Sequence, residues 1–192
     1  MFGQPRTVTS LLRSFQASQL HTFPAGKDFR LSQPHALLVN PWIHDFAAYD
    51  FWAKPMGLFV LAGLLRKAGW KVSIIDCLNR FHPRQPQNDA DRRFGRGPFI
   101  KTPIEKPAGL ADVKRHYSRY GIKPEWFEAD LANIEPPDLI LVTSLMTYWY
   151  SGVKETISII KRVWPDPRLA LGGIYASLCA GHARANSGAD MV

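Results

Sequence analysis

Apolar and polar residues alternate along the chain in blocks that predict strands and helices in turn. Four short apolar runs, each bounded by polar or turn-forming residues, have the length of buried strands. They occupy residues 36–39, 71–76, 138–143 and 168–171, and residues 189–192 resemble the opening of a fifth strand. The segments between these runs decide the class of fold, because parallel strands need long crossover connections.

Helical patterns fill most of the gaps between the predicted strands. Leucines within residues 55–69 fall on one face of a helix that Gly69 would end, and apolar residues at 153–163 recur with the same period. Residues 178–185 give a third, shorter helix. Strands that alternate with helices predict an α/β fold with a parallel, doubly wound sheet and right-handed crossovers.

The same pattern divides the chain into an extension and one domain with an insertion. Residues 1–33 are polar and weakly periodic, so the domain is expected to span residues 34–192. Residues 79–133 are rich in proline and charge and interrupt the alternation after the second strand, with one helical candidate at 110–120. Since a fifth strand only opens at 189–192, the sheet is expected to be incomplete at its C-terminal edge, either as the front of a longer protein or as a naturally short relative.

Composition narrows the class of protein. The formal charge is +8, but the basic residues are spread among acidic neighbours without a nucleic-acid motif, so we expect a solvated surface and no nucleic-acid partner. The longest apolar run, at 57–65, is far shorter than the roughly 20 residues of a membrane span. Two cysteines, Cys77 and Cys179, suit a reducing cytoplasm and are too few to hold an iron–sulfur cluster in this chain.

Three strand-to-helix loops are expected to meet at the carboxyl edge of the sheet, where α/β proteins bind their ligands. The loop at 40–54 is rich in aromatic residues, and the loop at 144–152 is rich in hydroxyl groups. The loop at 172–178 begins with Gly172 and Gly173, which lack the Cβ atom that would keep a ligand away from the backbone. Such an edge suits a wide, mostly apolar planar ligand with a polar tail.

Four motifs give the chain a family resemblance. They are Pro-x-Gly-Leu at 55–58, Leu-Leu-Arg-Lys-Ala-Gly at 64–69, Ser-Leu-Met-Thr-Tyr-Trp-Tyr-Ser-Gly-Val at 144–153 and Leu-Gly-Gly-Ile-Tyr-Ala at 171–176. Together with Arg-Arg-Phe-Gly-Arg-Gly in the insertion, they resemble the N-terminal cobalamin-binding domain of B12-dependent radical SAM proteins over residues 35–192.

The resemblance implies a flavodoxin-like Rossmann domain that holds cobalamin, and with it a cobalt ion, across the carboxyl edge of the sheet. The residues at corrinoid-binding positions are Ser144, Leu145, Thr147, Gly172, Gly173 and Tyr175. The implied partners are a corrinoid and a radical SAM catalytic domain or subunit, where methyl or radical chemistry would occur. No catalytic residue is assigned in this chain.

Two departures from the family pattern limit what the chain is expected to do. Cobalt-coordinating relatives carry Asp-x-His-x-x-Gly in the first loop, whereas His44 lacks both the Asp before it and the Gly after it. We therefore interpret His44 as an ordinary loop histidine, with cobalt ligation as the alternative. The chain also lacks a Cys-x-x-x-Cys-x-x-Cys motif, so it is not expected to be catalytically complete alone.

A function from a different class stays open. In this alternative the domain is a degenerate Rossmann interaction module that binds a protein partner and no corrinoid. Trp42, Phe46 and Trp52 distinguish the two, because aromatic side chains packed inward favour the interaction module and an open aromatic rim favours a ligand. A flavin or nucleotide binder on the same fold is a third hypothesis.

Overall fold

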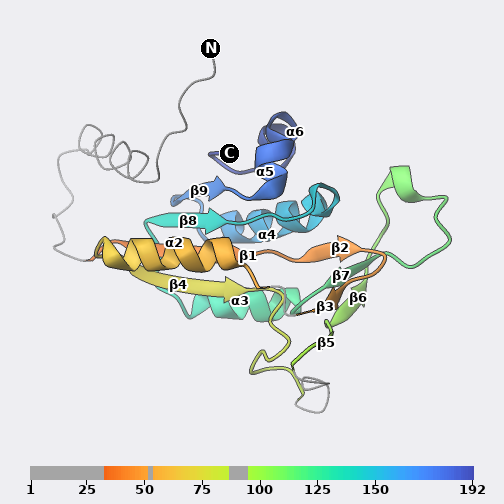
Figure 1. The fold of residues 1–192 in the computed structure, drawn as a ribbon, viewed down its shortest axis with the longest axis horizontal. Helices are drawn as coiled ribbons and strands as arrows, with labels where there is room; N and C mark the ends of the chain where they lie inside the picture. Colours follow the sequence, from red (N-terminus) through yellow and green to blue (C-terminus); the bar gives the residue numbers. More distant parts are fainter. Residues whose placement is uncertain (1–32, 52–53, 87–94) are drawn as a thin grey trace. The chain divides into compact units, whose positions relative to one another are not determined.

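The structure, a computed structural model, describes residues 33–51, 54–86 and 95–192. Apart from Gln33, the predicted N-terminal extension lies outside these residues. The described domain is a mixed α/β structure with a parallel four-stranded sheet and helices, which is compatible with a Rossmann-like fold (Figure 1).

The central sheet has the order β4–β1–β8–β9, and all of its neighbouring strands are parallel. Its strands are β1 (His35–Asn40), β4 (Lys71–Asp76), β8 (Leu139–Val142) and β9 (Arg168–Leu171), so the four predicted strands are all present. Every residue of β1 is buried, because β1 lies between two strands and carries helices on both faces. A single parallel bridge between Ala170 and Met191 stands where the fifth strand is predicted to open.

α2 (Met56–Lys67) covers one face of this sheet, over β1 and β4. It buries Leu58, Ala62 and Leu65, whose spacing of four and three residues places them on one side of the helix. No described helix is long and apolar enough to cross a membrane.

α3 (Pro124–Ala132) and α4 (Tyr150–Val163) lie on the opposite face of the sheet from α2, where they pack against each other (Figure 1). Phe127 of α3 and Ile157 of α4 share the main hydrophobic core with β1. Two short helices, α5 (Ile174–Leu178) and α6 (Ala180–Asn186), follow β9 and replace the single helix predicted at 178–185.

The insertion folds back onto the loop that follows β1. β7 (Ser118–Tyr120) pairs antiparallel with β2 (Ile43–Asp45) on one side and with β6 (Lys101–Pro103) on the other. A further pair joins β3 (Tyr49–Asp50) to β5 (Gly97–Pro98). The first loop and the insertion therefore form a second, antiparallel layer of structure beyond the carboxyl end of β1.

The helix predicted at 110–120 is wrong. A single 3-10 turn, η2 (Ala108–Leu110), ends at the first residue of this stretch, and the last three residues of the stretch form β7. Two neighbouring strands satisfy the backbone of β7, and Ser118 is fully buried between them. Long-range strand pairing has therefore overridden the local helical pattern.

Candidate functional site

Ser144 joins the loops that follow β8 and β9 at the carboxyl end of the sheet. Its hydroxyl donates a hydrogen bond to the carbonyl of Gly172 (2.6 Å) and accepts one from the backbone N–H of Ala176 (3.3 Å). Its own carbonyl accepts a hydrogen bond from the N–H of Ile174 at 2.9 Å. Ser144 is only 3% exposed, so the two loops are held together from inside.

Gly172 and Gly173 differ in what they contribute to this contact between the two loops. Gly173 has a φ of 94°, and a Cβ atom built on it would lie 2.1 Å from the carbonyl oxygen of Ser144. Only glycine fits there, because both the left-handed conformation and the close contact exclude a side chain. Gly172 is exposed, and a Cβ atom on it would meet no atom within 4 Å. The fold therefore requires Gly173, whereas Gly172 leaves open space beside the sheet edge.

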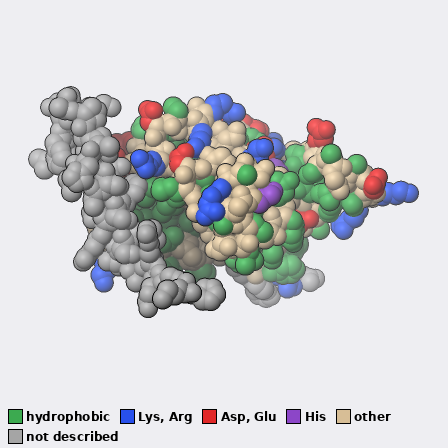
Figure 2. Space-filling view, turned by 90° about the horizontal axis from the view of Figure 1, so that it is seen from above, with side chains coloured by type: hydrophobic (Ala, Val, Ile, Leu, Met, Phe, Trp, Pro, Cys, Tyr) green, Lys and Arg blue, Asp and Glu red, His purple; other side chains and the backbone are tan. Residues whose placement is uncertain are grey.

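Exposed apolar and small residues surround this joint, and we call them the β8–β9 rim. They are Leu145, Met146, Tyr148, Gly172, Gly173, Ile174, Ser177 and Leu178. Figure 2 looks onto the side of the domain that carries α5 and α6, where hydrophobic side chains lie beside an exposed histidine. Tyr148 and Leu178 are 58% and 72% exposed. Apolar side chains gathered in this way mark a surface for a ligand or a partner.

Five of the six residues predicted to bind a corrinoid lie in these two loops. Leu145, Gly172 and Gly173 are exposed on the rim, and Thr147 is half-buried at the start of the 3-10 turn η3 (Thr147–Trp149). Ser144 is buried and acts through the hydrogen bonds described above. The loops thus present backbone and apolar side chains to solvent, with the one buried hydroxyl beneath them.

Tyr175, the sixth predicted residue, is 1% exposed and belongs to an aromatic cluster beside the rim. Its hydroxyl lies 2.8 Å from Nδ1 of His182, and the exposed His182 ring packs edge-on against Tyr150 with 4.9 Å between centroids. Burial raises the pKa of Tyr175, and the neighbouring Cys179 and Tyr150 raise it further, so the phenol is protonated at neutral pH. The sequence hides this contact, because a helix break at Cys179 separates the two partners.

His44 lies on β2 and faces α4. It is 5% exposed, and its Nε2 lies 2.9 Å from Oε2 of Glu155, at ion-pair distance but without the alignment of a hydrogen bond. Arg119 of β7 donates to both carboxylate oxygens of Glu155. Burial raises the pKa of Glu155, but His44 and the Arg119 hydrogen bonds outweigh it and lower this pKa to about 2. The buried His44 side chain therefore already has a charged partner, the half-buried Glu155 of α4.

The described aromatic residues of the first loop pack inward. Trp42 is 1% exposed, lies 5.1 Å from the ring of Phe127, and donates its Nε1–H to the carbonyl of Ile122 at 2.7 Å. Phe46 is half-buried against Tyr117, with 5.2 Å between ring centroids. Trp52 lies outside the described residues. Trp42 is thus a core residue rather than a residue that lines an open cleft.

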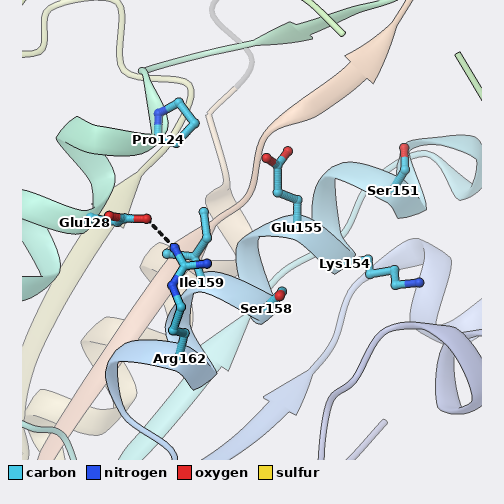
Figure 3. A pocket seen from close by; sticks show the side chains of 8 residues that line it. All are labelled: Pro124, Glu128, Ser151, Lys154, Glu155, Ser158, Ile159 and Arg162. Carbon is cyan, nitrogen blue, oxygen red and sulfur yellow. Dashed lines mark hydrogen bonds and ion pairs between the residues drawn. The ribbon is translucent and has the colours of Figure 1, made fainter. Parts of the chain in front are cut away.

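A hollow of about 440 Å³ lies between α3 and α4 (Figure 3). Eight residues line it: Pro124, Glu128, Ser151, Lys154, Glu155, Ser158, Ile159 and Arg162. Arg162 pairs with Glu128 across the hollow, and Glu155 is paired with Arg119 as described above. Because three of its four charged side chains are already paired, the hollow offers less to a ligand than the apolar rim does.

Within residues 33–51, 54–86 and 95–192, no group of three or more His, Cys, Asp or Glu side chains is placed to hold a metal ion. Comparison with models of known protein families gave no match, and comparison with curated proteins gave none either. The residues of the β8–β9 rim are therefore the evidence from which a function is proposed.

Proposed function

We propose that this chain is a corrinoid-binding domain with a flavodoxin-like, doubly wound sheet, and that it holds cobalamin at the β8–β9 rim. The observation that carries the proposal is the joint of Ser144 with Gly172 and Gly173. It brings the hydroxyl loop and the glycine loop together at one sheet edge, with open space at Gly172.

Sheet topology supports the finer fold assignment. With its four strands numbered by their order in the chain, the central sheet β4–β1–β8–β9 has the two-one-three-four order of flavodoxin-like sheets. In such sheets the ligand lies outside the carboxyl ends of the strands. Met191 bridges to β9 on the side where the next strand of such a sheet would pair.

The rim also suits a corrinoid chemically. A corrin ring has broad apolar faces, and Leu145, Met146, Ile174 and Leu178 offer exposed apolar side chains. Gly172 lets a ligand approach the backbone closely. In this proposal the chain's own residues bind the ring, exclude water from one of its faces and orient it. Bound cobalamin would supply a cobalt centre able to carry a methyl group or a radical to a catalytic domain or subunit.

Reconstitution tests the proposal directly. Purified protein is incubated with hydroxocobalamin, passed through a desalting column and examined by visible absorption. We expect retained corrinoid near one equivalent per chain with shifted visible bands. Protein that elutes colourless at every loading concentration would rule out the proposal.

A variant pair then locates the site. Gly172→Phe places a large side chain in the open space at the rim without a clash in the fold, and we expect it to weaken corrinoid binding at least tenfold. Gly109→Phe is the matched control, because Gly109 is also exposed, with no atom within 4 Å of its Cβ position. Equal binding by both variants would place the corrinoid elsewhere.

The inward packing of Trp42 favours the second candidate, a degenerate interaction module. In that case the apolar rim would contact a protein partner instead of a corrinoid. The module predicts no retained corrinoid at any concentration, so the reconstitution distinguishes the two candidates.

A further inference from the structure

His182 is the described histidine that lies beside the rim, next to Tyr150 and Tyr175. His35, His44 and His82 are buried, and each has a side-chain partner within the domain: Ser73, Glu155 and Asp130. His116 is exposed but lies in the insertion.

The position of His182 relates it to both rim loops. Its ring contacts Tyr150, the first residue of α4, which directly follows the loop from β8. It also contacts Tyr175, two residues beyond Gly173 in the loop from β9. A group bound across the two loops is therefore a neighbour of this imidazole.

Tyr175 can act as the outer partner of a metal-ligating His182, with its phenol oxygen in the place that a carboxylate, carbonyl or water more often takes. A ligating histidine usually donates its second ring N–H to a fixed oxygen, which sets the tautomer and the ring orientation. The Tyr175 oxygen, 2.8 Å from Nδ1, can accept such a proton and leave the Nε2 lone pair free. Because Tyr175 is buried, its oxygen is held in place by the core.

We infer that Nε2 of His182 coordinates the cobalt ion of the corrinoid bound at the β8–β9 rim, with Tyr175 as the positioning residue. This inference rests on the proposed corrinoid-binding function. Cobalt ligation would then come from α6 and not from His44, since the Nε2 atom of His44 is buried against Glu155.

Electron paramagnetic resonance of bound cob(II)alamin tests the inference. The protein is produced with ¹⁵N-labelled histidine and loaded with unlabelled hydroxocobalamin, which is then reduced to cob(II)alamin. A histidine ligand splits the cobalt lines into doublets, whereas the corrinoid's own dimethylbenzimidazole nitrogen splits them into triplets. We expect doublets, and their loss in His182→Gln, with His116→Gln as the matched control that keeps them.

The possible outcomes separate this inference from the proposed function. Retained corrinoid with triplets, or with no nitrogen splitting, overturns histidine ligation and leaves corrinoid binding intact. Doublets that persist in His182→Gln assign the ligand to another histidine and also overturn the inference. No retained corrinoid overturns both proposals.

Tyr175→Phe provides a second variant that conserves volume in the core. It leaves the imidazole in place but removes the oxygen beside Nδ1. We expect a smaller fraction of the cob(II)alamin signal to be split into doublets. We also expect the corrinoid affinity to fall about tenfold, as it does when other outer partners of a metal ligand are removed. Unchanged spectra and affinity would remove Tyr175 from the inferred role.

Discussion

Glu155 shows how one side chain connects the parallel sheet, through α4, to the three-stranded antiparallel sheet. It lies on α4, which covers the parallel sheet, and it is bound by Arg119 of β7 beside His44 of β2. Loss of one member of a half-buried charged group is destabilising, because the remaining members lose their partner away from water. The three residues therefore connect the insertion to the helix that begins at the rim.

Glu155→Gln is expected to destabilise the protein in a pH-dependent way. The pKa of Glu155 is lowered from 4.5 to about 2 in the folded state, so the carboxylate stabilises the fold above pH 4.5. This contribution, up to about 3 kcal/mol, is lost as the pH falls towards 2. Urea unfolding of wild type and variant at neutral pH and at about pH 3 measures the difference, which should shrink by half or more.

Glu128→Gln is the control for this experiment. Glu128 lines the same hollow, but its ion pair with Arg162 is exposed, and such pairs contribute at most about 1 kcal/mol. A stability difference for Glu155→Gln that is equal at both pH values would contradict the assigned pKa.

Sequence patterns reach some residues of the candidate site and not others. Ser144 and Gly172 could be predicted to be neighbours, because each follows a parallel strand and such strands end at one edge. His182 could not be predicted, because its relation to Tyr175 and Tyr150 depends on how two short helices turn after β9. No periodicity in the sequence encodes that turn.

At the scale of elements, the β8 and β9 loops behave as one unit because Ser144 fills the space that a side chain on Gly173 would need. The two glycines are adjacent in sequence but face different surroundings. Replacing each by alanine therefore separates the structural requirement from the open space.

Gly173→Ala is expected to destabilise the protein by about 3 kcal/mol or more, because it combines a left-handed residue with a backbone clash. Gly172→Ala is expected to change stability by less than about 1 kcal/mol. Denaturant unfolding of both variants measures the effects. A similar stability for the two would mean that the loops are not joined as described.

The elements that the sequence does not predict are those whose strands pair with distant segments of the chain. The local pattern predicts a helix where β7 lies, because the pairing partners of β7, β2 and β6, come from other segments of the chain. α3 carried a usable local signal, since Pro124 stands at its first turn and Phe127 and Leu131 are four residues apart. The proline-rich surroundings of the insertion obscured that signal.

At the scale of the whole domain, the two cysteines differ in how deeply they are buried. Cys77 is fully buried and Cys179 is half-buried. Burial, with a smaller contribution from Asp76, raises the pKa of the Cys77 thiol well above its ordinary value. Because the thiolate is the reactive form, both effects protect Cys77 from labelling.

We expect native protein to react with a thiol reagent in two phases. Cys179 should react first, and Cys77 at least about a hundredfold more slowly, when the domain opens. Absorbance of the released chromophore measures both rates, and Cys179→Ser should remove only the fast phase. Equal rates for the two thiols would contradict the burial of Cys77.

The parallel sheet could be predicted at this scale because its four strands are apolar runs separated by helical patterns. The antiparallel layer could not, because its strands are only two or three residues long and mostly polar. Short strands of this kind acquire their conformation from their partners rather than from their own sequence.

The position of β1 between β4 and β8 has a consequence for synthesis of the chain. β4 and α2 leave the ribosome soon after β1, whereas His35 meets Asp138, at the edge of β8, only after 103 further residues. The whole insertion must be translated while one side of the most buried strand is still unpaired. At elongation rates of about 5–20 residues per second, this interval lasts for seconds, in which the unpaired edge of β1 is open to aggregation.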